Sequence, residues 1–168
     1  MPIPIFISVG QRYKPEQDRL MAQVLAALAA TDLEPTILPH SAWDEAFPLA
    51  PIQSSMRQCF GVVVIAFPRI TADLAREWPD SHRETQLQGH SLATVWLQIE
   101  ATLALELGKP LLILVDDRLH PEGVLNPKHR GYNAHYFNMN ECQQELPVNI
   151  VQWIAEFSEQ VKAVSGSG

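Results

Sequence analysis

The sequence predicts an α/β fold in which a mostly parallel sheet of about five strands carries helices on both faces. Segments with strand pattern alternate with segments with helix pattern, the order typical of parallel strands joined by right-handed crossovers. Segments 61–67 and 111–115 are apolar almost without interruption, and such strands are usually buried on both faces. A chain of 168 residues suffices for one well-filled core. We therefore expect a three-layer, flavodoxin-like single domain over residues 1–164.

The first third of the chain predicts two strands separated by one helix. Residues 3–9 are rich in β-branched side chains and end at Gly10, which suits a buried strand. Pro15 then begins a helix that has acidic residues in its first turn, where they stabilise a helix. Residues 34–38 predict the second strand, and the prolines near its two ends favour an edge position. The apolar face of the helix has amphipathic spacing and consists of Leu20, Met21, Val24, Leu25 and Leu28.

The middle of the chain predicts a short helix over 51–58, the buried strand 61–67, a long helix over 92–107 and the buried strand 111–115. The long helix is the clearest in the sequence, because a glycine and then a proline stand where it ends. Its spacing predicts a stripe that faces the sheet, made of Leu92, Val95, Trp96, Ile99 and Leu103.

The last third predicts a short strand over 135–137 and a helix over 143–164. Residues 165–168, of sequence Ser-Gly-Ser-Gly, are interpreted as a flexible tail or an expression remnant outside the domain. Two connections, 68–91 and 116–133, are much longer than the roughly two to six residues usual in such folds. The first of them is interpreted as a functional loop or an insertion.

Composition excludes several classes of function. A net charge of −7 and a pI near 5.3 argue against a nucleic-acid partner, which needs a basic surface. No apolar run reaches the ~18–20 residues of a membrane span, and the first residues lack the pattern of a secretory signal. The two cysteines are far apart and the six histidines show no metal-ligand spacing. We therefore expect a cytoplasmic protein with no membrane partner, no metal and no cofactor.

Glu100 is the carboxylate that stands out by position. It lies one turn after Trp96 at the border of the predicted stripe, in the half of the helix nearer the carboxyl edge of the sheet, where such folds bind ligands. Glu106 is the competing acid, but it lies in the last turn, at the opposite edge. A half-buried glutamate beside a tryptophan can have a shifted pKa and can stabilise a developing cation. On spacing alone, a solvated glutamate at the border of an amphipathic helix remains the alternative.

The segment from Trp96 to Glu100 resembles the W-x-x-x-E helix motif of TIR domains. The residues after it, 101–110, are similar both to TIR domains and to nucleoside 2-deoxyribosyltransferases, in which a glutamate helix runs into an A-x-x-L-G-K-P turn before the next strand. The first strand and segment 50–67 resemble TIR segments as well, so the resemblance covers residues 3–115. It implies an N-glycosidase in which Glu100 is the catalytic residue and acts at the anomeric carbon of a nucleoside or of an NAD ribose.

The resemblance also implies how the substrate is held. Residues after the first strand are expected to contact ribose or phosphate, an arginine to hold a phosphate, and aromatic rings to shape the pocket or stack on the base. Ordinary packing is the alternative for each aromatic ring. These expected substrate-binding residues are Ser8, Gly10, Gln11, Trp96, Arg69, Phe67 and Trp43, with Tyr13 as a further stacking candidate.

Three functions remain open on the sequence. The first is a TIR-like enzyme that cleaves NAD, or a related nucleotide, as its substrate, with a role in stress or phage-defence signalling. The second is a nucleotide-binding or sensing module of the same fold, in which Glu100 fixes a ribose hydroxyl without turnover. The third is an interaction domain that self-associates through the aromatic and acidic loop 42–47, as TIR domains often do. The resemblance implies a homo-oligomer.

Overall fold

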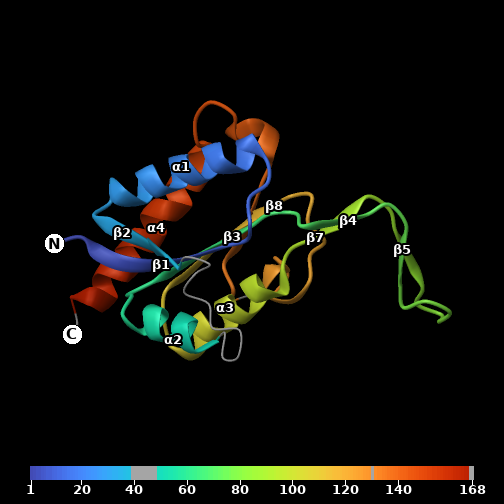
Figure 1. The fold of residues 1–168 in the computed structure, drawn as a ribbon, viewed down its shortest axis with the longest axis horizontal. Coiled ribbons are helices and arrows are strands. Elements are labelled where there is room, and N and C mark those ends of the chain that lie inside the picture. The colour runs from blue at the N-terminus through green and yellow to red at the C-terminus, as the bar shows by residue number, and fades with distance from the viewer. Residues whose placement is uncertain (39–48, 130, 167–168) are drawn as a thin grey trace.

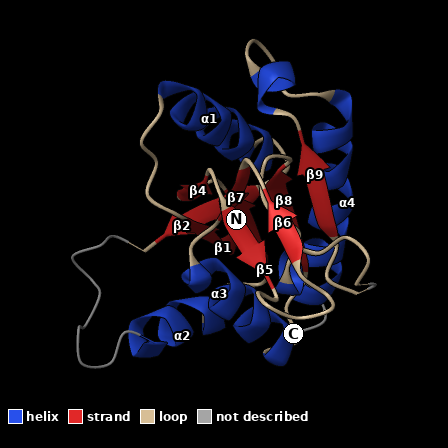
Figure 2. Ribbon diagram, turned by 90° about the vertical axis from the view of Figure 1, so that its right-hand side faces the viewer, coloured by secondary structure: helices blue, strands red, loops and turns tan. Residues whose placement is uncertain are grey.

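The centre of the molecule is a five-stranded sheet in which every neighbouring pair of strands is parallel (Figures 1 and 2). The computed structural model describes residues 1–38, 49–129 and 131–166. The strand order, β2-β1-β3-β8-β9, is that of flavodoxin-like sheets, and the order reverses between β1 and β3. The predicted fold class is confirmed. The strands are β1 (Ile3–Val9), β2 (Leu33–Ile37), β3 (Val62–Ala66), β8 (Leu111–Asp116) and β9 (Ala134–Phe137).

Helices cover both faces of this sheet. The helices α1 (Pro15–Ala29) and α4 (Val148–Ser165) pack on one face, and α2 (Leu49–Arg57) and α3 (Val95–Glu106) pack on the other. β2 is an edge strand, as the prolines of this segment of the sequence predict. No helix among the described residues is both long enough and apolar enough to cross a membrane.

The side chains of each strand alternate between the two faces. In β1, Ile5 and Ile7 join the core under α1 and α4, whereas Phe6 joins the core under α2 and α3. Every residue of β3 and of β8 is buried, because both strands lie inside the sheet and both faces are covered. The prediction that 61–67 and 111–115 are buried on both faces is confirmed.

The face that α3 turns to the sheet differs from the predicted stripe. Val95 is 67 % exposed and Ile99 is 37 % exposed, and Leu92 belongs to the strand before the helix. Apolar residues surround most of this helix, so spacing alone does not select one face. The positions of the small residues determine which face packs on the sheet, because small side chains let the helix approach it closely. The buried positions are Leu97, Glu100, Ala101 and Ala104, so Glu100 lies within the buried face and not at its border.

Several helix ends also differ from prediction. α3 begins at Val95, since the Thr94 hydroxyl caps it by accepting a hydrogen bond from Trp96 N at 3.4 Å. α4 begins after Pro147, so residues 143–147 of the predicted helix are irregular, and a short 3-10 turn, η3 (Met139–Cys142), precedes them. At its other end α4 continues through Ser165, the first residue of the predicted tail.

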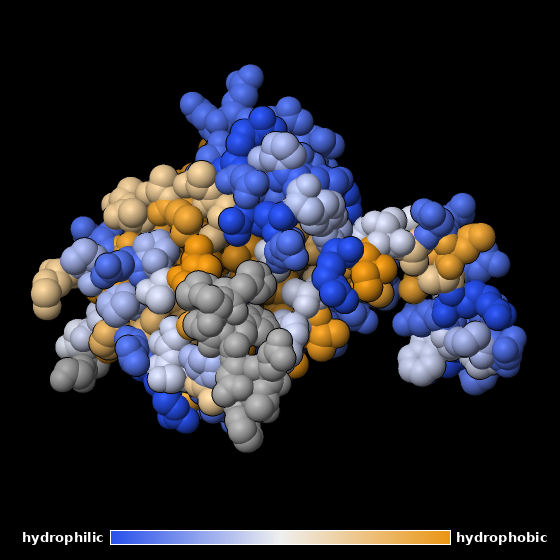
Figure 3. All heavy atoms as spheres, viewed as in Figure 1, coloured by the Kyte–Doolittle hydropathy of each residue, from blue (hydrophilic) through white to orange (hydrophobic). Residues whose placement is uncertain are grey.

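The long connection before α3 forms an arm, which we define as residues 70–92. In it β4 (Ile70–Ala72) pairs with β7 (His90–Leu92), and β5 (Ala75–Glu77) pairs with β6 (Thr85–Leu87), both antiparallel. Figures 1 and 3 show the arm projecting from the body of the domain. No described residue of the arm belongs to either hydrophobic core. The interpretation of this segment as an insertion agrees with that placement.

Shortening the arm is expected to leave the fold intact. Ala72 lies directly opposite His90 in the ladder, so replacing residues 73–89 by Asn-Gly would close the pair with a two-residue turn. Because the deleted residues contribute nothing to either core, we expect the melting temperature to change by no more than about 4 °C, roughly 1 kcal/mol for a domain of this size. Circular dichroism with thermal unfolding measures this. Loss of the cooperative transition would contradict the interpretation.

Candidate functional site

A cavity of about 240 Å³ lies at the carboxyl edge of the sheet, next to the point where the strand order reverses. Ligands in open α/β sheets bind at such a place. Its walls come from three parts of the chain: the residues after β1, the residue that leads from β3 into the arm, and the first two turns of α3. They are Val9, Gly10, Gln11, Arg69, Thr94, Trp96, Leu97 and Glu100.

Glu100 is a buried acid in this wall. Its residue is only 5 % exposed, and among the described residues no cation forms an ion pair with its carboxylate. Burial raises the pKa of Glu100 above the usual 4.5, and the nearby Ser8 hydroxyl lowers it in part. A carboxylate held without a counterion in a poorly solvated place is costly for the fold, and a cation formed in the cavity would relieve that cost.

Ser8 is the second unusual polar group. It lies in β1, is 2 % exposed, and its Oγ has no hydrogen-bond partner among the described residues. The hydroxyl is near enough to affect the pKa of Glu100, but the two groups are not in hydrogen-bonding geometry. A buried hydroxyl without a partner costs about 1–3 kcal/mol, so such a group indicates a place where water or a ligand binds.

The structure brings most of the expected site residues together. Gly10, Gln11, Arg69 and Trp96 line the same cavity as Glu100, and Ser8 lies beside it. The Arg69 guanidinium forms no hydrogen bond or ion pair with any described residue, while its backbone N–H donates to Leu92 O at 2.8 Å. That guanidinium is therefore available to an anionic group at the cavity.

Other expected residues are not placed there. Phe67 belongs to the core under α1 and α4, and its ring packs edge-on against Phe137 with 6.5 Å between centroids. Tyr13 is 55 % exposed and is not part of the cavity wall. Trp43 and the loop 42–47 lie outside the described residues.

Three residues of the wall were not predicted: Val9, Thr94 and Leu97. Thr94 could have been found, because a threonine just before an apolar helix is a typical N-cap. Across the described part of the chain, no three His, Cys, Asp or Glu side chains gather as metal ligands. The absence of a metal and of a cofactor stays a prediction.

Comparisons with known proteins add a fold likeness. No protein-family model matches the chain, and no curated protein does. Among solved structures, the Clostridium botulinum CMP N-glycosidase BcmB is similar, with 13 % sequence identity and a TM-score of 0.49, over 84 % of this chain and 94 % of that chain. A likeness of this size concerns the fold and does not bear on activity.

The raised pKa of Glu100 gives a stability prediction with a definite sign. A carboxyl whose pKa is higher in the folded state stabilises the fold below the unfolded-state pKa, and this contribution is lost as pH rises through the folded-state pKa. Glutamine cannot ionise. We therefore expect the melting temperature of Glu100→Gln, relative to that of the wild type, to increase as pH rises from about 4 to about 8. Calorimetry across this range measures the difference. The exposed Glu106→Gln on the same helix is the control. A difference that does not change with pH would contradict the prediction.

Proposed function

We propose that the protein is a nucleotide N-glycosidase that cleaves the ribosyl C–N bond in the cavity beside Glu100. The observation that carries the proposal is a buried carboxylate without an ion-pair partner among the described residues, next to a buried hydroxyl that has no hydrogen-bond partner among them. Both lie at the edge of the sheet where such folds bind ligands. Both groups suit the cleavage of an N-glycosidic bond. A carboxylate stabilises the positive charge that develops on the ribose, and a hydroxyl can form a hydrogen bond with a hydroxyl group of the sugar.

The chemistry assigned to Glu100 is electrostatic or nucleophilic. When the base leaves, the C–N electron pair goes to the base nitrogen, and positive charge develops on C1′ and the ring oxygen of the ribose. The Glu100 carboxylate stabilises that charge, and its poorly solvated surroundings strengthen the attraction. Water then supplies the oxygen that bonds to C1′ and releases a proton to solvent.

The remaining wall residues bind and orient the substrate. Ser8 is assigned to a ribose hydroxyl, Gln11 and the Gly10 backbone to ribose or phosphate, and Arg69 to a phosphate at the mouth of the cavity. Trp96 supplies a wall for the departing base. A volume of about 240 Å³ is smaller than the roughly 300–1,000 Å³ of sites for drug-sized ligands. We therefore expect it to take one ribose and one base, with the rest of a larger nucleotide outside.

The substrate we propose first is NAD, with the nicotinamide riboside half inside the cavity. The test measures released base by chromatography after incubation with NAD, with nicotinamide mononucleotide and with CMP, which has the same type of bond and a different base. Low and high protein concentrations are compared, because we also propose that the protein acts as a homo-oligomer, and size-exclusion chromatography reports that state. Base release that disappears in Glu100→Gln supports the proposal.

Absence of release separates the alternatives. If no substrate is cleaved at either concentration but NAD raises the melting temperature, the protein is a binding module, because a bound ligand stabilises the folded state. If there is neither release nor stabilisation by any of the three nucleotides, the proposal is overturned.

A further inference from the structure

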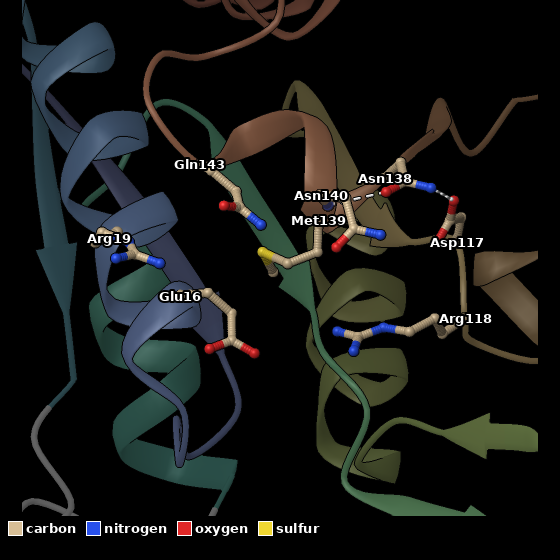
Figure 4. Close-up of a pocket in the computed structure, with 8 residues that line it drawn as sticks. All are labelled: Glu16, Arg19, Asp117, Arg118, Asn138, Met139, Asn140 and Gln143. Carbon is tan, nitrogen blue, oxygen red and sulfur yellow. Dashed lines mark hydrogen bonds between the residues drawn. The ribbon is translucent and has the colours of Figure 1, made fainter.

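A second, polar pocket of about 310 Å³ lies at the same edge of the sheet, and it shares no wall residue with the Glu100 cavity. It is bounded by the first turn of α1, by the residues after β8, and by the segment around η3 (Figure 4). Charged side chains of both signs and side-chain amides form most of its wall. These charged and amide residues include Glu16, Arg19, Asp117, Arg118, Asn140 and Gln143.

Arg118 is held in a fixed orientation. The carboxylate of Asp116 is fully buried and accepts hydrogen bonds from the Arg118 backbone N–H at 3.1 Å, from Nε at 2.8 Å and from Nη2. This pairing raises the pKa of Arg118. The Nη1 atom makes no hydrogen bond to any described residue, and Figure 4 shows the guanidinium directed into the pocket. A donor that is already oriented binds an anionic group at little entropic cost.

Glu16 faces this guanidinium from the opposite wall. It comes from the first turn of α1, and its carboxylate forms no hydrogen bond or close ion pair with any described residue. Arg19, one turn further along α1, is likewise without an ion pair among those residues, and Figure 4 shows both side chains reaching toward the pocket. Among the described residues, the pocket therefore offers the free carboxylate of Glu16, the carboxylate of Asp117, which accepts a hydrogen bond from Asn138, and two donor guanidiniums.

The charges select the class of ligand. The carboxylates of Glu16 and Asp117 would repel a ligand that is only an anion. The guanidiniums of Arg19 and Arg118 would repel a ligand that is only a cation. A ligand that carries both signs satisfies both walls. No aromatic side chain belongs to the described wall of this pocket, so the wall itself offers a nucleobase no ring to stack on.

We propose that this pocket binds a free α-amino acid with a polar side chain. Its carboxylate accepts hydrogen bonds from Nη1 of Arg118, and its ammonium group donates to the Glu16 carboxylate. Arg19, Asn140 and Gln143 are left to contact the polar side chain, which favours an acidic or amide group. This proposal does not depend on the N-glycosidase activity, since it concerns a separate pocket.

Thermal unfolding and calorimetric titration with L-glutamate and L-glutamine test the proposal. Glutarate, which has the carbon chain of glutamate without its ammonium group, is the matched probe. We expect either amino acid to raise the melting temperature at about 10 mM, while glutarate does not. Binding of glutarate equal to that of glutamate would show a plain anion site, and no shift with either amino acid at that concentration would show no site. Both outcomes overturn the proposal.

The variant is Glu16→Gln, because replacing Arg118 would leave the buried Asp116 carboxylate without its partner. Loss of one charge-assisted hydrogen bond is expected to weaken amino-acid binding about tenfold. The control is Asp18→Asn, which removes one charge from the same turn but belongs to the exposed ion pair with Arg12 at 2.7 Å. Equal affinities of Glu16→Gln and the wild type would overturn the assignment of the ammonium group to Glu16.

Discussion

Replacing Glu100 by glutamine is expected to lower kcat/KM for base release by at least about 10²–10³-fold, the loss typical when a group that stabilises transition-state charge is removed. Glutamine has nearly the size of glutamate, so it keeps the packing of α3 while removing the negative charge that the ribosyl cation requires. In the wild type, kcat/KM is expected to fall in acid, with a midpoint above the usual 4.5 for glutamate because burial raises the pKa of Glu100. Steady-state kinetics with NAD as a function of pH measures both effects.

Two variants make this result specific. Glu106→Gln changes the same residue type on the exposed side of the same helix and is expected to keep full activity. Ser8→Ala is expected to raise KM more than it lowers kcat, because its hydroxyl is assigned to substrate binding. Full activity of Glu100→Gln would remove Glu100 from the reaction, and equal losses in Glu100→Gln and Glu106→Gln would point to damage to the helix.

Replacing Ile113 by alanine is expected to destabilise the domain by about 2–5 kcal/mol. Ile113 is fully buried in β8, which pairs with β3 on one side and β9 on the other, so the cavity left behind cannot collapse easily. For a domain of this size, the loss corresponds to roughly 5–20 °C in melting temperature. Urea unfolding followed by circular dichroism gives the free energy, provided that the slope with denaturant stays constant.

The matched control is Ile37→Ala. Ile37 lies in the edge strand β2 and is 42 % exposed, so the same chemical change creates no closed cavity there. We expect a loss of less than about 1 kcal/mol, because much of this side chain is already solvated. Similar losses at Ile37 and Ile113 would contradict the arrangement of buried and edge strands described above.

The central strands could be predicted from the sequence because a run of consecutive apolar residues indicates a strand that is buried on both faces. β3 and β8 consist of consecutive apolar residues, apart from the acid that ends β8. The orientation of α3 could not be predicted in the same way. Its apolar residues surround the helix, and Ala101 and Ala104 rather than Ile99 face the sheet, because small side chains permit close approach. Glu100 was selected from its position beside a predicted stripe, which is wrong, and from the W-x-x-x-E resemblance.

Sites built from distant segments could be predicted from the sequence only in part. Gly10, Arg69 and Glu100 could be grouped only because parallel strands end at one edge of the sheet. Nothing local connects Glu16 with Arg118, which are about one hundred residues apart in the chain. They line one pocket only because α1 begins, and β8 ends, at the same edge of the sheet. Phe67 was expected at the site because it follows β3 at the same edge of the sheet. Side chains alternate between the two faces along a strand, and Phe67 points to the face under α1 and α4, where it joins the core.

The arm lies in a connection whose length can change at little cost to the stability of the domain. The connection between the end of β3 at Ala66 and the start of α3 at Val95 is 28 residues long, 95 minus 66 minus 1. The entropy of closing a loop grows only with the logarithm of its length, at about 0.6 kcal/mol for each doubling. Extending an ordinary connection of about six residues to this length therefore costs little more than about 1 kcal/mol. Insertions and deletions can accumulate between Arg69 and Thr94 while the ends of the connection, which line the Glu100 cavity, stay where they are.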